Sequence, residues 1–181
     1  MHIAVKIAAA TVTAIVVAVG GGAAWHMHKK MPVRDGDLTL QHITAPVKVA
    51  YDERGVPHIR ARSEADMYRA LGYVHAQDRL FQMEMVRRLA KGELAEILGP
   101  KLLDTDKLFR TLDIRERAKD MAAALDPASP VGVALLAYLD GINQYQATRP
   151  VPLEFTDREF NRMRPSMERV LGLETRLAKA G

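Results

Sequence analysis

The sequence predicts an α+β fold that is mainly α-helical, with a short N-terminal β-hairpin followed by several helices. Between residues 46 and 61 apolar and polar residues alternate, which is the period of half-buried strands. From Ser63 onward apolar residues recur every three or four positions, which is the period of an amphipathic helix. At 181 residues the chain is long enough for one domain with its own core.

The first 30 residues are predicted to form a separate N-terminal segment. Residues 7–25 carry no charged side chain and follow Lys6. Residues 7–19 have the length of a signal-peptide hydrophobic region, and the Gly-Ala-Ala of residues 22–24 is a small-residue cleavage site. The uncharged run is also barely long enough to cross a bilayer. We therefore expect export to the periplasm or the medium, and both a cleaved signal peptide and an uncleaved inner-membrane anchor remain open.

The basic isoelectric point, near 9.4, does not indicate nucleic-acid binding. Three of the 26 basic residues and none of the 22 acidic residues lie in the first 30 positions, which leaves 23 against 22 elsewhere. No basic face with interleaved aromatic residues remains, so we expect no nucleic-acid partner. The chain has no cysteine, which excludes disulfides and thiolate metal sites.

The β-hairpin is predicted from residues 46–51 as one strand, 52–55 as the turn and 56–61 as the return strand. Both strands are rich in valine and isoleucine, and the turn contains Asp52 and Gly55. Pro57 lacks a backbone N–H and therefore places the return strand at a sheet edge or a bulge.

Capping residues delimit the predicted helices. Ser63 can cap a long helix that ends near Lys91, with Asp66 reaching back to the cap and Gly92 as the stop. A short helix over 93–98 ends at a Gly-Pro pair, and Asp104 or Asp106 opens the next one. Two further helices are expected over residues 114–125 and 131–147.

An aspartate interrupts the apolar stripe of the long helix. The stripe consists of Met67, Leu71, Val74, Asp78, Phe81, Met85 and Leu89. A buried carboxylate is costly unless it is paired, so Asp78 is predicted to bind an arginine such as Arg110 or backbone N–H groups. A general acid or base is the alternative, but no second acid is spaced to work with Asp78. The predicted structural residues are Asp78, Arg79, Arg88, Asp106 and Arg110, with an i,i+4 pair between the last two. Replacement of Asp78 by alanine is expected to impair folding or precursor maturation, not proton transfer.

No catalytic, cofactor-binding or metal-binding residue is predicted in this chain. The serines are Ser63, Ser129 and Ser166, and none lies in a Gly-x-Ser-x-Gly turn. Ser63 is better explained as a cap and Ser129 as a turn residue between prolines. The six histidines show no metal-ligand spacing.

Several sequence blocks point to a known family. Residues 47–61, VKVAYDERGVPHIRA, and residues 72–88, GYVHAQDRLFQMEMVRR, closely resemble the α chain of the penicillin acylase family. Blocks at 92–99, 106–110, 137–143 and 152–155 continue the resemblance in order.

The resemblance implies a specific chemistry. Members are exported N-terminal-nucleophile hydrolases with an αββα fold that cleave linear amide bonds in penicillins, cephalosporin side chains or acyl-homoserine lactones. A single precursor cuts itself into an α chain and a larger β chain, and the nucleophile is the serine that begins the β chain. Its own α-amine acts as the base, and calcium often binds, mostly through β-chain ligands. The implied partners are therefore the β chain and a small acyl amide substrate, and this chain alone is expected to be inactive.

The resemblance weakens after Thr156. Residues 157–181 contain no tryptophan and hold six basic against four acidic residues, where the family continues with a Pro-x-x-Trp block. We therefore divide the chain into a leader or anchor (1–30), an α-chain-like domain (31–156) and a divergent tail (157–181), which suggests a truncation or a frameshift. The alternative function is a non-enzymatic, membrane-tethered helical interaction module, or a degraded remnant.

Overall fold

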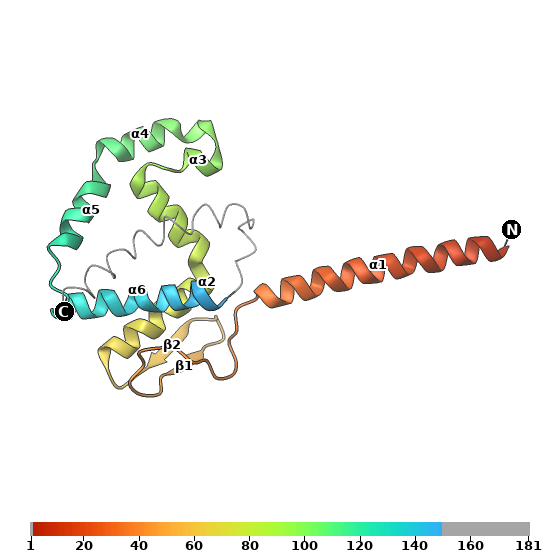
Figure 1. Cartoon of the computed structure of the whole chain (residues 1–181), viewed down its shortest axis with the longest axis horizontal. Coiled ribbons are helices and arrows are strands. Elements are labelled where there is room, and N and C mark those ends of the chain that lie inside the picture. The colour runs from red at the N-terminus through yellow and green to blue at the C-terminus, as the bar shows by residue number, and fades with distance from the viewer. Residues whose placement is uncertain (1, 150–181) are drawn as a thin grey trace.

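The hairpin and the helices follow the predicted order. The computed structural model describes the backbone of residues 2–149 and the side chains of residues 12–28 and 30–149. The elements are α1 (His2–Lys30), β1 (Lys48–Tyr51), β2 (Pro57–Arg60), α2 (Glu64–Lys91), α3 (Ala95–Leu98), the 3-10 turn η1 (Pro100–Leu102), α4 (Leu103–Thr111), α5 (Ile114–Ala123) and α6 (Pro130–Thr148). The predicted fold class, mainly helical with one short antiparallel hairpin near the N-terminus, is confirmed (Figure 1). The predicted tail, residues 157–181, lies outside the described residues.

The N-terminal helix α1 projects away from the rest of the chain as a single rod (Figure 1). Its large apolar side chains are exposed, with Val17 and Val19 each 67% exposed and Trp25 61% exposed. Within the residues that were described, no helix is both long enough and apolar enough to cross a membrane. Export and the fate of the leader remain predictions.

The hairpin forms around the predicted turn. The strands β1 and β2 are antiparallel, with Val49 opposite Ile59. The Asp52 carboxylate closes the turn because its Oδ1 accepts hydrogen bonds from the backbone N–H groups of Arg54 and Val56, both at 2.9 Å. Pro57 is the first residue of β2, where its missing N–H is tolerated in a two-stranded sheet.

Both ends of α2 are capped as predicted. The Ser63 hydroxyl accepts the backbone N–H of Asp66 at 3.1 Å, which satisfies one of the free donors of the first turn. Gly92 ends the helix in the left-handed conformation with φ of 65°. A Cβ at this position would lie 2.5 Å from the backbone carbonyl oxygen of Asp106, so the close approach of α4 also requires glycine here.

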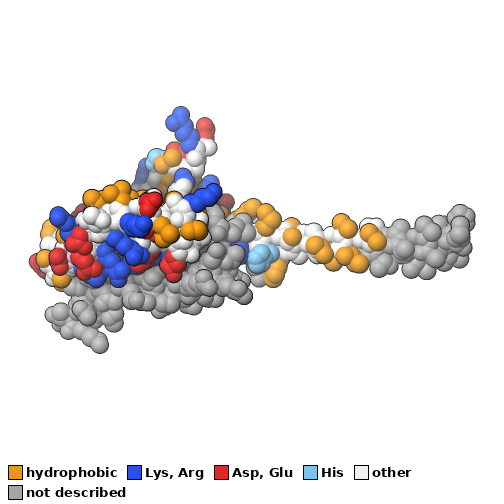
Figure 2. All heavy atoms as spheres, turned by 90° about the horizontal axis from the view of Figure 1, so that it is seen from above, with side chains coloured by type: hydrophobic (Ala, Val, Ile, Leu, Met, Phe, Trp, Pro, Cys, Tyr) orange, Lys and Arg blue, Asp and Glu red, His pale blue; other side chains and the backbone are white. Residues whose placement is uncertain are grey.

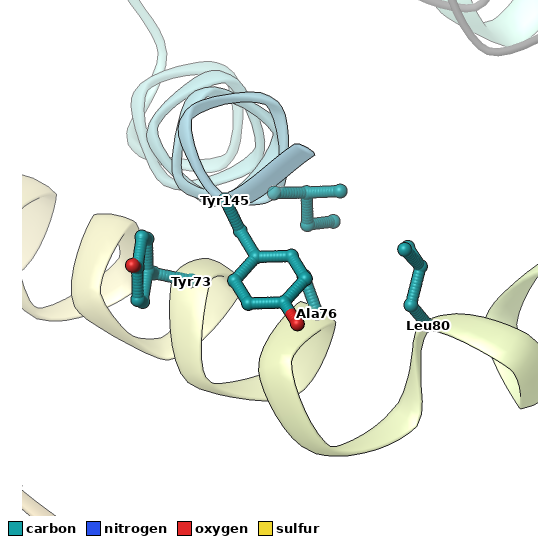
Figure 3. Close-up of a cluster of buried hydrophobic side chains, with 5 residues drawn as sticks. Tyr73, Ala76, Leu80 and Tyr145 are labelled. Atoms are coloured by element: carbon teal, nitrogen blue, oxygen red, sulfur yellow. The ribbon is translucent and has the colours of Figure 1, made fainter. Parts of the chain in front are cut away.

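The core lies where α6 crosses α2. Gly72 of α2 and Gly141 of α6 allow the approach, because a Cβ on either would overlap a backbone carbonyl oxygen of the other helix. The buried cluster consists of Tyr73, Ala76, Leu80, Ile142 and Tyr145. Tyr145 descends from α6 onto α2 beside Tyr73 and Ala76 (Figure 3). The two tyrosine rings meet edge to face with centroids 5.4 Å apart, a favoured aromatic arrangement.

The helices α3, α4 and α5 form an arc from the C-terminal end of α2 to the start of α6 (Figure 1). Large apolar side chains on this arc are exposed, including Leu108 at 56% and Met121 at 75%. Acidic and basic side chains are interspersed on the face seen in Figure 2.

Candidate functional site

The buried face of α2 is shifted by one position from the predicted stripe. Among the residues of the predicted stripe, only Val74 is buried. Asp78 and the other residues of the stripe are half-buried and lie at the border of the buried face of α2. The sequence-based prediction counted apolar residues alone, whereas charged residues with internal partners are buried here as well. At helical spacing the buried positions are Asp66, Ala70, Tyr73, Gln77, Leu80, Glu84 and Arg88.

The helix α2 is kinked in its middle, one residue after Asp78. Arg79 has φ of −138° and ψ of 15°, which are not helical angles. Such a residue interrupts the regular backbone hydrogen bonding of a helix. The kink therefore lies within the sequence block AQDRLFQM, which carries the family resemblance.

Asp78 lies against the segment that connects α1 to β1. Its side chain is 18% exposed, and its Oδ1 lies 3.9 Å from Nη2 of Arg34. The predicted arginine partner is therefore present, but it is Arg34; the suggestion of Arg110 is wrong because Arg110 binds elsewhere. Within residues 12–28 and 30–149, no hydrogen-bond donor reaches Oδ1 of Asp78. The contact is an ion pair without a hydrogen bond.

Gln77 joins the same cluster from the buried face of α2. Its Nε2 donates to the backbone carbonyl oxygen of Val33 at 3.2 Å and to the Tyr51 hydroxyl at 3.4 Å. Burial, and then the charge of Asp78, raise the pKa of the Tyr51 hydroxyl. The Arg34 guanidinium lies 5.2 Å from the centre of the Tyr51 ring, within cation–π range. Gln77 Oε1 is buried and accepts no hydrogen bond from the described residues.

A cavity of about 500 Å³ opens beside this cluster. It lies between the segment of residues 33–47, strand β1 and the N-terminal half of α2. Polar groups of Arg34, Tyr51 and Gln77 share its lining with apolar side chains. The volume is that of a typical small-molecule or side-chain pocket. We refer to Arg34, Tyr51, Gln77, Asp78 and this cavity as the kink site.

Of the two arginines, Arg88 is buried and Arg79 is exposed. Arg88 is 4% exposed and donates from Nε to Glu84 at 2.7 Å and from Nη1 to Glu96 at 2.9 Å. Glu84 also accepts two hydrogen bonds from Arg87, both at 2.7 Å. Arg79 is exposed, and its Nη1 is 3.4 Å from Oε1 of Gln82.

Asp106 and Arg110 do anchor the chain, but not through the predicted pair with each other. Buried Asp106 accepts the backbone N–H groups of Leu94 and Ala95 at 2.9 and 2.8 Å. Arg110 donates from Nε to the carbonyl oxygen of Gly92 at 2.9 Å. Both residues therefore bind the turn between α2 and α3 and not each other, because the free backbone groups of this turn need hydrogen-bond partners.

The full burial of Asp66 and the internal ion pair of the half-buried Asp140 were not predicted from the sequence. Asp66 is fully buried and binds the hydroxyl and the backbone N–H of Thr44 at 2.6 and 3.0 Å. Asp140 accepts from Arg69 Nε at 2.6 Å. Although burial raises the pKa of Asp140, hydrogen bonds from Arg69, Gln144 and His42 lower it overall. Only Asp66 could have been recognised as buried from the sequence. It lies four residues before Ala70, and residues four positions apart share one face of a helix.

The described residues contain no assembled hydrolytic centre. The hydroxyl of Ser63 accepts a backbone N–H group at the start of α2, as predicted for a cap. Ser129 was predicted as a turn residue, but its hydroxyl also caps a helix, at the start of α6. Ser166 lies outside the described residues. In the same residues no group of three or more His, Asp or Glu side chains could hold a metal ion. The arrangement can bind and position another group through the kink site, but it places no nucleophile beside a base.

Comparison with known proteins identifies relatives over most of the chain. The penicillin amidase family matches residues 46–170, so the match continues beyond Thr156 into the segment predicted to diverge. Penicillin acylase 2 proenzyme of Pseudomonas sp. (strain SE83) is 44% identical over 126 residues, which cover 69% of this chain and 16% of that protein. Acyl-homoserine lactone acylase QuiP of Pseudomonas fluorescens (strain Pf0-1) is 32% identical over 144 residues, which cover 80% of this chain and 17% of that protein.

A solved structure is also similar. The thermostable penicillin G acylase from Alcaligenes faecalis shares 36% sequence identity, with a TM-score of 0.49 over 56% of this chain and 53% of that chain. The chain spans about one-sixth of the length of the curated relatives named above. The family match covers more than half of the chain, including the hairpin and the kinked helix. The chain belongs to the penicillin amidase family.

Proposed function

We propose that this chain is the α-chain segment of an exported hydrolase that acts on linear amide bonds, such as acyl side chains of β-lactams or acyl-homoserine lactones. The family match over residues 46–170 carries this proposal. Relatives at 44% and 32% identity are named as a penicillin acylase proenzyme and an acyl-homoserine lactone acylase, which supports amide hydrolysis as the reaction class.

In this proposal the chain is a scaffold and a larger companion chain supplies the nucleophile. The matched relatives are about six times as long as their matched segments, so most of such an enzyme lies outside this region. The Ser63 and Ser129 hydroxyls serve as helix caps and are poorly placed for nucleophilic attack. By the family resemblance, a calcium ion would take most of its ligands from the companion chain.

The exposed apolar residues of the arc support a companion chain. Leu103, Leu108 and Met121 are 49%, 56% and 75% exposed on α4 and α5. Apolar side chains gathered on neighbouring helices are typical of surfaces that another polypeptide covers. Burying these three side chains against the larger chain would remove their apolar surface from water.

Reconstitution tests the proposal. The chain is purified alone and together with the remainder of the Pseudomonas sp. SE83 proenzyme, and both samples are assayed with a chromogenic phenylacetyl amide and a long-acyl homoserine lactone. We expect turnover only from the reconstituted pair. Turnover by this chain alone would contradict the scaffold role, and a stable pair without turnover on any acyl amide would contradict the reaction class.

A further inference from the structure

The last turn of α1 carries a group of soft metal ligands on its surface. Met27 and His28 lie in α1, and Met31 follows directly after Lys30, its last residue. The backbone N–H of Met31 donates to the carbonyl oxygen of His28 at 3.2 Å, so the helical turn extends to Met31. We refer to Met27, His28 and Met31 as the thioether cluster.

Helix geometry brings the three side chains of the thioether cluster to one face. Side chains three and four positions apart are neighbours on a helix, and Met31 lies three positions after His28 and four after Met27. His26 lies off this face, because it is two positions before His28 and five before Met31. The cluster therefore offers two thioether sulfur atoms and one imidazole side by side.

The thioether cluster is open to an incoming ion. Met27 is 48% exposed and Met31 is 56% exposed, and His28 is exposed as well. Figure 2 shows histidine side chains on the surface of α1, close to where this helix joins the rest of the chain. An ion can therefore reach all three ligands without any movement of the folded part.

The ligand types and the nearby charges select the metal. Thioether sulfur is a soft ligand, and together with imidazole it favours Cu(I) over hard cations such as calcium. The first acidic residue of the chain is Asp35, so the cluster contains no carboxylate that would hold a hard cation. Lys29 and Lys30 add positive charge beside the cluster, and they repel a monovalent ion about half as strongly as a divalent one.

We propose that the thioether cluster binds one Cu(I) ion through the sulfur atoms of Met27 and Met31 and one imidazole nitrogen of His28. The inference does not depend on the proposed function, because it uses no residue of the kink site or of the arc. The three ligands stay in the chain whatever the fate of the leader, since they follow the cleavage site predicted at residues 22–24.

Trp25 provides a reporter for this site. It lies three positions before His28, which places the two side chains on adjoining parts of the α1 surface. It is also the sole tryptophan of the chain. A cation held within about 6 Å of an indole ring interacts with its π electrons, so a metal ion bound at the thioether cluster should change the fluorescence of Trp25.

The test titrates the purified full-length chain with Ag(I), an air-stable monovalent soft ion, in chloride-free buffer. The fluorescence of Trp25 should change and saturate at one Ag(I) per chain. The variants Met27→Leu, His28→Asn and Met31→Leu should each raise the dissociation constant at least about tenfold, because even the loss of an outer-shell partner weakens metal binding about 10- to 100-fold. Competition with the chelator bicinchoninate then measures the binding of Cu(I) itself.

Met121→Leu and His26→Asn are the matched controls. Met121 is 75% exposed, and no histidine or methionine lies within four positions of it in the sequence. Both controls should bind Ag(I) like the unchanged chain. Leucine and methionine have similar volumes and helix propensities, so the circular dichroism spectra of the Met27 and Met31 variants should match that of the unchanged chain.

Four results would overturn the proposal. The first two are the absence of saturable Ag(I) or Cu(I) binding and unchanged affinity in the variants of the thioether cluster. The third is a loss of affinity in Met121→Leu or His26→Asn as large as that in the cluster variants, which would show binding without a defined face. The fourth is displacement of Ag(I) by an equal concentration of Zn(II), which would show that soft ligands do not define the site. None of these results bears on the reconstitution assay, so the failure of this inference and the failure of the proposed function are distinguishable.

Discussion

Replacing Glu84 by glutamine tests whether the buried charges hold α2 together. Glu84 is 1% exposed and accepts three hydrogen bonds at 2.7 Å, two from Arg87 and one from Arg88. Arg88 is itself 4% exposed, and its remaining acidic partner, Glu96, has a side chain that is 65% exposed. The change Glu84→Gln would therefore leave a buried guanidinium facing an amide.

The expected cost follows from this geometry. Removing one partner of a buried ion pair costs about 3–5 kcal/mol because the other charge is left uncompensated. The matched control is Glu116→Gln, where Lys119 binds the carboxylate at 2.7 and 2.9 Å with the same i,i+3 spacing but on a side chain that is 54% exposed. That change should leave the free energy of unfolding almost unchanged, because water screens an exposed ion pair.

Urea unfolding of the purified chain, monitored by circular dichroism, measures the loss of unfolding free energy for both variants. The thermal midpoint of the Glu84 variant should fall by roughly 10 °C. A double variant, Glu84→Gln with Arg88→Met, should recover part of the loss, because both ends of the interaction are then uncharged. Costs for Glu84 and Glu116 that agree within about 1 kcal/mol would refute the reasoning.

Three further changes test other parts of the fold. Gly72→Ala should destabilise the chain by about 1–3 kcal/mol by forcing α6 away from α2, whereas Gly21→Ala, which meets no atom within 4 Å, should not; both are measured by urea unfolding. Hydrogen bonds from the hydroxyl and then the backbone N–H of Thr44 lower the pKa of Asp66 from 3.8 to about 2. The stability from this lowered pKa is complete above pH 3.8 and is lost as the pH falls through about 2, so Asp66→Asn should flatten the acid limb of a pH titration of stability. Asp106→Asn should cost about 1–3 kcal/mol and accelerate amide exchange at the start of α3; unchanged exchange there would contradict the anchoring role.

Local chemistry determined the order and the ends of the elements. The Ser63 cap and the Gly92 stop were predicted from sequence and are present, because each depends on groups within a few residues. The same holds for the hairpin, whose turn is closed by Asp52 within its own loop. The residue blocks of the hairpin and α2 also sufficed to indicate the family.

Tertiary structure decided which side of α2 is buried and which groups pair. Thr44 meets Asp66 across 22 positions and Arg69 meets Asp140 across 71, and no local pattern encodes such separations. Once these partners are available, charged residues can enter the interior at little cost, so a stripe drawn from apolar residues alone is displaced. The sequence identified Asp78 as an unusual carboxylate on an apolar stripe. Only the packing of residues 33–47 against α2 showed that the paired cation is Arg34 and that Oδ1 of Asp78 lacks a hydrogen-bond donor within the described residues.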